Sequence, residues 1–320
     1  MKVLANDGIS RSGEEALIEA GFEVIKTTVA QSQLMSYINT HNIDVLLVRS
    51  ATKVREDIID GCPSLKIIGR GGVGMDNIAV NHARKKGLHV INTPEASAQS
   101  VAELVFAHLF GGVRFLHDAN RTMPLEGDTR FKELKKNYAL GTELRGKTLG
   151  IIGFGSIGKE VAKIALGIGM KVIASKSAAH TGTAVVTLPF YNKQSIDISI
   201  EITSTEALLK QADFITIHVP AQEEYLIDQH QFEIMKNGVG IINAARGGVV
   251  NEVALIKALE SGKVAFAGID TFEEEPTPAI QVLMNGKISL TPHIGAATKE
   301  AQDRIGTELA SQIIKLTSQN

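Results

Sequence analysis

Short apolar runs alternate with amphipathic segments along most of this chain. The runs are rich in Val, Ile and Leu and are continuously apolar, as in "DVLLVRS", "TLGIIGFG" and "VGIIN", which is typical of strands covered on both faces of a sheet. The segments between them, such as "GEEALIEAG" and "EVALIKALESG", carry apolar residues at helical spacing. This alternation of strand and helix predicts an α/β fold with doubly wound parallel sheets.

The length of 320 residues exceeds the size at which one hydrophobic core usually keeps growing. We therefore expect two doubly wound domains. The first combines residues 1–95 with 296–320, which makes it discontinuous, and the second comprises residues 96–295. The segment 97–121 is expected to be one long connecting helix, and the polar stretch 123–146 an irregular surface crossing.

An unusually long connection lies within residues 177–203. Its two halves are rich in β-branched and aromatic residues, partly alternate with polar ones, and are joined by "NKQ". This pattern favours a β-hairpin over a structureless loop. We expect a surface elaboration without chemistry.

The charges of the chain are nearly balanced and point to no strongly charged partner. Lys and Arg number 33 against 35 Asp and Glu, for a formal net charge of -2, so no partnership with nucleic acid or an anionic membrane is expected. The single cysteine, Cys62, excludes an internal disulfide framework and a multi-cysteine metal site, and no metal is expected. No apolar run is long enough for a signal peptide or a membrane span, so we expect a soluble, cytoplasmic protein.

A glycine pattern follows the apolar strand "TLGII" and opens the next helix. Gly153, Gly155 and Gly158 form G-x-G-x-x-G, which in this context indicates a dinucleotide-binding turn. The first glycine suits the tight turn, the second lets the backbone approach a pyrophosphate, and the third allows close packing of helix and strand. Backbone N–H groups at the start of the helix would then meet the phosphate charge.

The residue expected to reach the adenosine ribose is unusual. Such folds often carry Asp or Glu about 20 residues after the turn, which binds the ribose and disfavours a 2′-phosphate. Here the strand ends in Lys176. A lysine tolerates the extra phosphate of NADP, but it is also compatible with NAD bound through backbone and hydroxyl groups. We expect NAD as cofactor, with NADP possible and discrimination weak.

Three charged residues follow predicted strands and suit the reduction of a 2-oxo acid. Arg246 follows "VGIIN", and a guanidinium grips a carboxylate through two hydrogen bonds. Glu275 and His293 lie in the loops "TFEEEP" and "TPHIG". A carboxylate beside an imidazole favours its protonated form and so keeps a proton donor near the keto oxygen. Each residue also has an ordinary structural explanation as a surface ion pair or a loop residue.

With these motifs in place, the chain resembles the D-isomer-specific 2-hydroxyacid dehydrogenases from end to end. The resemblance rests on "LLVRSATKV", "IIGRGGVGMDNI", "NTPEASAQSVAEL", "GIIGFGSIGKEVA", "ADFITIHVP", "INAARGGVVNE", "GIDTFEEEP" and "TPHIGAAT". It implies that residues 1–95 and 296–320 form a flavodoxin-like substrate-binding domain, that residues 96–295 form a Rossmann dinucleotide-binding domain, and that the reaction takes place in the cleft between the two. It also implies that Arg246, Glu275 and His293 are the catalytic set. His293 would exchange a proton with the substrate oxygen, Glu275 would pair with His293, and Arg246 would bind and polarise the substrate.

The resemblance also implies further contacts and a homodimer. Cofactor contacts would come from the glycine turn, the ribose position and the loops beyond: Val73, Gly153, Gly155, Ser156, Ile157, Gly158, Lys176, Val219, Ala244, Asp270, His293, Ile294, Gly295 and Ala296. Substrate contacts would come from the first domain and from the catalytic arginine: Arg49, Ser50, Arg70, Gly71, Gly72, Val73 and Arg246.

Within that family, the resemblance is strongest to the members that act on 3-phospho-D-glycerate. It implies NAD-dependent oxidation of this compound to 3-phosphohydroxypyruvate, at the start of serine synthesis. Reduction of glyoxylate or hydroxypyruvate with NADH or NADPH is the alternative, and a non-enzymatic dinucleotide-sensing protein is an alternative of another class. Because the chain ends soon after its last helix, we expect no feedback regulation through an additional C-terminal domain.

Overall fold

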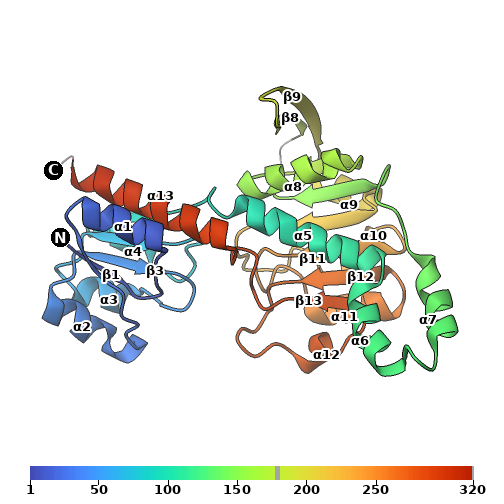
Figure 1. Cartoon of the computed structure of the whole chain (residues 1–320), viewed down its shortest axis with the longest axis horizontal. Coiled ribbons are helices and arrows are strands. Elements are labelled where there is room, and N and C mark those ends of the chain that lie inside the picture. The colour runs from blue at the N-terminus through green and yellow to red at the C-terminus, as the bar shows by residue number, and fades with distance from the viewer. Residues whose placement is uncertain (177–180, 319–320) are drawn as a thin grey trace. The chain divides into compact units, whose positions relative to one another are not determined.

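The computed structural model describes residues 1–176 and 181–318, and the chain divides into two compact units. The first unit consists of Met1–Ser100 and Ala296–Asn320, and the second of Val101–Gly295 (Figure 1). Each unit is built around its own sheet. The expected α/β fold class with two doubly wound sheets is confirmed.

The first unit has a five-stranded sheet in which all strands are parallel. The strand order is β2-β1-β3-β4-β5, which is the flavodoxin-like order. Its elements are β1 (Lys2–Ala5), α1 (Arg11–Glu19), β2 (Glu23–Ile25), η1 (Gln31–Gln33), α2 (Leu34–His41), β3 (Val45–Val48), α3 (Glu56–Gly61), β4 (Ile67–Arg70), α4 (Val80–Lys85), β5 (His89–Asn92) and α13 (Lys299–Thr317).

The last helix, α13, packs along α1 although the two lie at opposite ends of the chain (Figure 1). Their backbones touch at two glycines, since a Cβ built on Gly13 would lie 2.5 Å from the carbonyl carbon of Gly306. Ile305, Leu309 and Ile313 of α13 are buried against the sheet. This apolar stripe explains why the C-terminal segment belongs to the first unit.

The second unit has an eight-stranded sheet, in the order β13-β12-β11-β10-β6-β7-β9-β8. Every pairing is parallel except that of β8 with β9. Its elements are α5 (Ala98–Val113), α6 (Leu116–Glu126), α7 (Phe131–Asn137), η2 (Tyr138–Leu140), β6 (Thr148–Ile152), α8 (Ser156–Gly167), β7 (Lys171–Ser175), β8 (Gly182–Pro189), β9 (Ser195–Ile202), α9 (Thr205–Gln211), β10 (Phe214–Ile217), α10 (Gln229–Ile234), β11 (Val239–Asn243), α11 (Glu252–Glu260), β12 (Val264–Ile269), α12 (Ile280–Leu283) and β13 (Ile288–Leu290).

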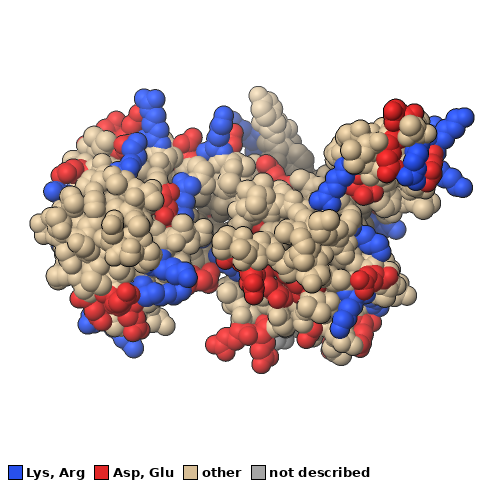
Figure 2. Space-filling model, turned by 90° about the horizontal axis from the view of Figure 1, so that it is seen from below, with Lys and Arg blue, Asp and Glu red and all other residues tan. Residues whose placement is uncertain are grey.

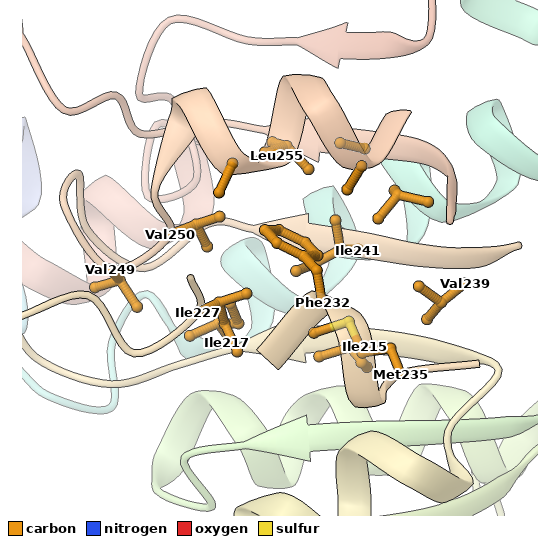
Figure 3. Close-up of a cluster of buried hydrophobic side chains, with 14 of the residues drawn as sticks. Ile215, Ile217, Ile227, Phe232, Met235, Val239, Ile241, Val249, Val250 and Leu255 are labelled. Atoms are coloured by element: carbon orange, nitrogen blue, oxygen red, sulfur yellow. The ribbon is translucent and has the colours of Figure 1, made fainter. Parts of the chain in front are cut away.

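Apolar side chains fill the space between this sheet and the helices that cover it. Figure 3 shows Phe232 of α10 surrounded by Ile241 of β11 and Leu255 of α11, with Ile227 and Met235 beside them. All five are buried, with at most 3% of the surface of each exposed. This packing fixes the strands whose carboxyl ends carry the candidate site.

The expectation of one helix over 97–121 is wrong. Helices α5 and α6 meet at Phe115, whose φ of 56° lies in the left-handed region and ends the first helix. The carbonyl of Val113 accepts the N–H of Thr142 at 3.0 Å instead of a helical N–H. This long-range hydrogen bond stabilises the break.

The expectation of an irregular crossing over 123–146 is also wrong. Helix α6 continues through Pro124, and α7 and η2 follow. Tyr138 donates a hydrogen bond from its hydroxyl to Asp118 of α6 at 2.8 Å. Side-chain contacts between the helices therefore order a stretch whose composition alone suggested a loop.

The expected hairpin is present as β8 and β9, which pair antiparallel from Gly182 opposite Ile202 to Pro189 opposite Ser195. Strand β9 joins the sheet beside β7 in parallel. Residues 177–180 of the long connection lie outside the described residues.

Charges of both signs are interspersed on the face shown in Figure 2, in keeping with the small net charge. Among residues 1–176 and 181–318, no helix is long and apolar enough to cross a membrane. The same residues include no group of three or more His, Cys, Asp or Glu side chains arranged to hold a metal ion.

Candidate active site

The three charged residues expected to act together lie in loops that follow neighbouring strands. Arg246 follows β11, Glu275 follows β12 and His293 follows β13. These strands are parallel and adjacent in the sheet (Figure 1). Their carboxyl ends lie at one edge, the usual place for a ligand in an open α/β sheet.

His293 and Glu275 form a direct pair. Nδ1 of His293 lies 2.8 Å from Oε2 of Glu275, while Oε1 of Glu275 accepts the N–H of Phe272 at 3.0 Å. The second bond fixes the carboxylate, and the carboxylate orients the ring. With Nδ1 engaged, Nε2 is the ring nitrogen that can exchange a proton with a substrate.

The backbone at His293 has a left-handed conformation, with φ of 54°, which is uncommon for a residue other than glycine. A buried carboxylate, Asp270, supports this loop. It accepts the N–H groups of Ile294 and Gly295 at 2.8 and 2.9 Å and the hydroxyl of Thr291 at 2.7 Å. Asp270 therefore lies behind the histidine loop and holds its backbone.

The loop carrying Arg246 is held by Asn243, the last residue of β11. The Asn243 amide donates to the carbonyl of Arg246 at 3.0 Å and accepts the N–H of Ala245 at 3.1 Å. The guanidinium also donates from Nη1 to the carbonyl of Ala245 at 2.7 Å. A polar residue at the end of an apolar strand was the sequence signal for this support.

The arginine loop and the glutamate loop are in contact. A Cβ built on Gly247 would lie 1.7 Å from the carbonyl oxygen of Phe272, so only glycine allows the two backbones to approach this closely. Two glutamates also bridge the loops. Glu252 donates its N–H to Glu273 at 2.8 Å, and Glu273 donates its N–H to Glu252 at 2.9 Å. No local pattern indicated this reciprocal arrangement.

Burial raises the pKa of the Glu252 carboxyl, and the neighbouring Glu273 carboxylate contributes in the same direction. The hydrogen bond from the Glu273 N–H opposes this increase. The bridge therefore places the buried carboxyl of Glu252 beside the exposed carboxyl of Glu273, and the Glu273 N–H partly offsets the cost of burying the Glu252 charge.

The glycine turn lies at the same edge of the sheet, after β6. Gly153 has φ of 93°, and a Cβ there would lie 2.2 Å from the His218 carbonyl oxygen. A Cβ on Gly158 would lie 2.4 Å from the Gly153 carbonyl oxygen, so the helix packs closely on the turn. In contrast, a Cβ on Gly155 would meet nothing within 4 Å. This open side is where a pyrophosphate would approach the backbone.

Helix α8 begins at Ser156 without a side-chain hydrogen bond to its first turn. The N–H groups of Ser156 and Ile157 therefore remain available at the positive end of a twelve-residue helix. Together with the open side of Gly155, this arrangement fits the phosphates of a dinucleotide.

A neutral histidine lies beside the turn. The His218 ring accepts or donates a hydrogen bond with Thr216 at 2.9 Å through Nε2, and burial lowers its pKa to about 3. Its Nδ1 is buried and has no hydrogen-bond partner among the described residues. The ring therefore adds no positive charge next to the half-buried Val219, which follows it.

Lys176 follows β7 directly and is exposed. The preceding Ser175 is buried, and its hydroxyl accepts a hydrogen bond from Thr205 at 3.3 Å. In the described part of the chain, no hydrogen bond or ion pair holds the Lys176 ammonium. Lys176 therefore follows the strand end at which we expect the ribose of a dinucleotide to bind.

The remaining expected cofactor residues fall in both units. Ala244 is buried directly before the arginine loop, and Gly295 is buried at the end of the histidine loop. Ala296 begins the C-terminal part of the first unit, and Val73 is 37% exposed in that unit.

In the first unit, Arg49 and Ser50 follow β3. Asp7 accepts the N–H of Arg49 at 2.6 Å, and burial lowers the pKa of the Arg49 guanidinium, an effect that Asp7 opposes. Arg49 is half-buried and Ser50 is exposed. A half-buried guanidinium is suited to binding an anion.

The run from Arg70 to Val73 follows β4. Gly71 donates its N–H to the last carbonyl of β3 at 2.9 Å, and Gly72 donates to Thr93 Oγ1 at 2.8 Å. The Arg70 guanidinium bonds the Gly71 carbonyl at 3.3 Å. Gly71 and Gly72, which are expected to contact the substrate, thus already use their N–H groups in hydrogen bonds, and within the described residues the N–H of Val73 has no partner.

Comparison with known proteins shows the family of this chain. A family profile described as D-isomer specific 2-hydroxyacid dehydrogenase, NAD binding domain, matches residues 106–295. A hydroxypyruvate reductase of Thermotoga maritima is 44% identical over 321 residues, which cover 98% of this chain and 97% of that protein.

A second curated relative and a crystal structure are also similar to this chain. A D-3-phosphoglycerate dehydrogenase of Bacillus subtilis is 38% identical over 317 residues, but this chain spans only 56% of its length. The crystal structure of a glyoxylate reductase from Paecilomyes thermophila has a TM-score of 0.80 and 28% sequence identity, with coverage of 98% of this chain and 93% of that one.

The contact between the arginine and glutamate loops can be tested with neighbouring glycines. Replacing Gly247 by alanine should lower the free energy of unfolding by about 3 kcal/mol, because the new Cβ overlaps the Phe272 backbone. Gly248→Ala is the matched control. Gly248 has φ of 74° and open space around its Cβ position, so only the conformational cost of about 1 kcal/mol is expected. Urea unfolding of both variants measures the difference, and equal losses would contradict the close contact.

Proposed function

Since the chain belongs to the D-isomer-specific 2-hydroxyacid dehydrogenase family, we propose that it reduces a short 2-oxo acid, hydroxypyruvate or glyoxylate. The observation that carries the proposal is the His293–Glu275 pair at 2.8 Å, one strand away from the loop of Arg246. The similarity to the Thermotoga maritima hydroxypyruvate reductase, which extends over 97% of that protein, supports this choice of substrate.

In the proposed reaction, Arg246 binds the substrate carboxylate through its guanidinium. Nε2 of His293 donates a proton to the carbonyl oxygen as that oxygen gains negative charge. Glu275 accepts the Nδ1–H and compensates the positive charge of the doubly protonated ring. A nicotinamide dinucleotide held at the glycine turn would supply the hydride for the carbonyl carbon, so that the product would be a 2-hydroxy acid.

Oxidation of 3-phospho-D-glycerate is the second candidate. The Bacillus subtilis phosphoglycerate dehydrogenase supports it through 38% identity, although this chain spans only 56% of that protein. A substrate with both a phosphate and a carboxylate requires more than one cation. Among the residues expected to contact the substrate, Arg49 of the first unit is a half-buried cation of this kind.

The catalytic assignment can be tested by steady-state kinetics on hydroxypyruvate, glyoxylate and 3-phospho-D-glycerate. We expect hydroxypyruvate or glyoxylate to give the highest kcat/KM. His293→Ala should lower kcat by about 10³-fold because the proton donor is lost. His230→Ala, an exposed histidine of α10 in the same unit, is the control and should leave turnover unchanged.

The outcomes separate the candidates. A higher kcat/KM for phosphoglycerate than for either 2-oxo acid would favour the second one. Dinucleotide binding without turnover of any of the three acids would favour a dinucleotide-sensing protein instead. Unchanged turnover in His293→Ala would remove His293 from the catalytic set.

We also propose that the enzyme uses either NADH or NADPH, because Lys176 is exposed where an acid would repel a 2′-phosphate. Lys176→Glu should lower kcat/KM with NADPH by about tenfold and leave NADH within about threefold. Lys171→Glu makes the same charge change at the exposed start of β7, and it should alter neither value. If Lys176→Glu leaves kcat/KM with NADPH unchanged, the lysine does not face the ribose.

We propose further that the enzyme is a homodimer. Large apolar side chains are exposed on α6 and η2, among them Leu116 at 55%, Leu125 at 80% and Leu140 at 78%. Exposed apolar side chains that gather on neighbouring elements often mark a protein–protein interface. Sedimentation should give twice the chain mass, and a monomer at micromolar concentration would contradict the proposal.

A further inference from the structure

A histidine with no role in the reaction proposed above lies behind the histidine loop. His108 is on α5, and only 3% of its surface is exposed. Its Nε2 lies 3.0 Å from the hydroxyl of Thr291, and its Nδ1 lies 2.8 Å from the hydroxyl of Ser289. Thr291 in turn donates to Asp270 at 2.7 Å. A continuous chain of hydrogen bonds therefore leads from α5 to the carboxylate that holds the loop.

The direction of each hydrogen bond between His108, Thr291 and Asp270 follows from the number of protons that each group can donate. The Thr291 hydroxyl has one proton, which is used in the bond to Asp270. Its oxygen can then only accept, so Nε2 of His108 carries a proton and donates it. Burial lowers the pKa of His108 and favours the neutral ring, with the Asp270 charge opposing this shift and His117 adding to it. In the neutral ring Nδ1 accepts the Ser289 hydroxyl proton.

The position of His108 is also fixed sterically. A Cβ on Gly268 would lie 2.6 Å from the Cβ of His108, so the strand β12 approaches this side chain through a glycine. A Cβ on Gly295 would lie 3.1 Å from Asp270 Oδ2. The ring, the carboxylate and the loop backbone are thus packed with little room to move.

The loop needs such support because of its conformation. His293 has φ of 54°, which an L-residue other than glycine adopts at a cost of about 1 kcal/mol or more. Asp270 offsets this cost by accepting the next two backbone N–H groups, those of Ile294 and Gly295. An Asp270 side chain free to rotate would lose one or both bonds, and Thr291 prevents that rotation only while its own proton points toward Asp270.

We propose that His108 is a positioning residue for His293. Its Nε2–H directs the Thr291 hydroxyl onto Asp270, and Asp270 then holds the backbone that carries His293. The effect of His108 on turnover rests on the proposed function, whereas the effect of His108 on the backbone of the histidine loop does not.

Two pairs of variants test the chain of hydrogen bonds. His108→Leu removes both ring contacts, and His108→Gln keeps a donor near the Nε2 position. Thr291→Val removes the hydroxyl at nearly constant volume, and Thr291→Ser keeps it. Ser289→Ala is the matched control, because it removes the partner of Nδ1 and leaves the bonds through Nε2 intact.

Amide hydrogen exchange gives the direct readout. In His108→Leu and Thr291→Val, exchange at Ile294 and Gly295 should become about tenfold faster than in the wild-type protein, with core strands unchanged. In His108→Gln, Thr291→Ser and Ser289→Ala, the two rates should remain within about threefold of wild type. A general loss of stability would instead accelerate exchange throughout the second unit.

Kinetics adds a second readout. If His293 is the proton donor, His108→Leu and Thr291→Val should lower kcat by about tenfold with little change in KM, because the donor is misplaced rather than removed. The two conservative variants should recover most of this loss. A wild-type protein without turnover would refute the proposed function, while the exchange rates would still decide the role of His108.

The wild-type protein supplies a test that needs no variant to fold. Nitrogen-15 NMR of labelled histidine should show His108 as the neutral Nε2–H tautomer at neutral pH. Observation of the Nδ1–H tautomer would overturn the proposal, and so would unchanged exchange at Ile294 and Gly295 in both His108→Leu and Thr291→Val.

Discussion

The buried carboxylate of Asp270 makes the hydrogen bonds that hold the His293 loop at the carboxyl edge of the second sheet. It is 1% exposed and accepts two backbone N–H groups and one hydroxyl. A buried carboxylate is costly without such partners, and the loop amides would be unpaired without the carboxylate. Each side thus requires the other, and the result is a fixed backbone at His293.

The loops of Arg246 and Glu275 depend on a different constraint, which is their contact with each other. The glycine at 247 lets their backbones touch, and Glu252 and Glu273 exchange hydrogen bonds across the same gap. Loops held in this way would lose little further freedom on binding a ligand, so less of the binding energy would be spent on ordering them. The three loops share one edge because their strands are neighbours in a parallel sheet.

Much of the fold could be predicted from the sequence because strands buried on both faces give nearly continuous apolar runs. The hairpin over 182–202 was also predictable, since its two halves alternate around a polar turn. The helix break at Phe115 was not, because the apolar periodicity continues up to Val113 and the carbonyl there is captured by the distant Thr142. Local patterns do not contain such long-range hydrogen bonds.

The same contrast between local patterns and long-range hydrogen bonds holds for the candidate site. It distinguishes the three charged residues from the residues that hold their loops. Arg246, Glu275 and His293 could be singled out because each closely follows a strand, and their roles remain predictions. His108 and Thr291, in contrast, are 183 positions apart, and a lone histidine on an apolar helix gives no sign of a partner. Which nitrogen of His108 carries the proton follows only from the hydrogen bond in which Thr291 donates its single proton to Asp270. A buried hydrogen-bond network is determined by which group has a proton left to donate, and that depends on all its members together.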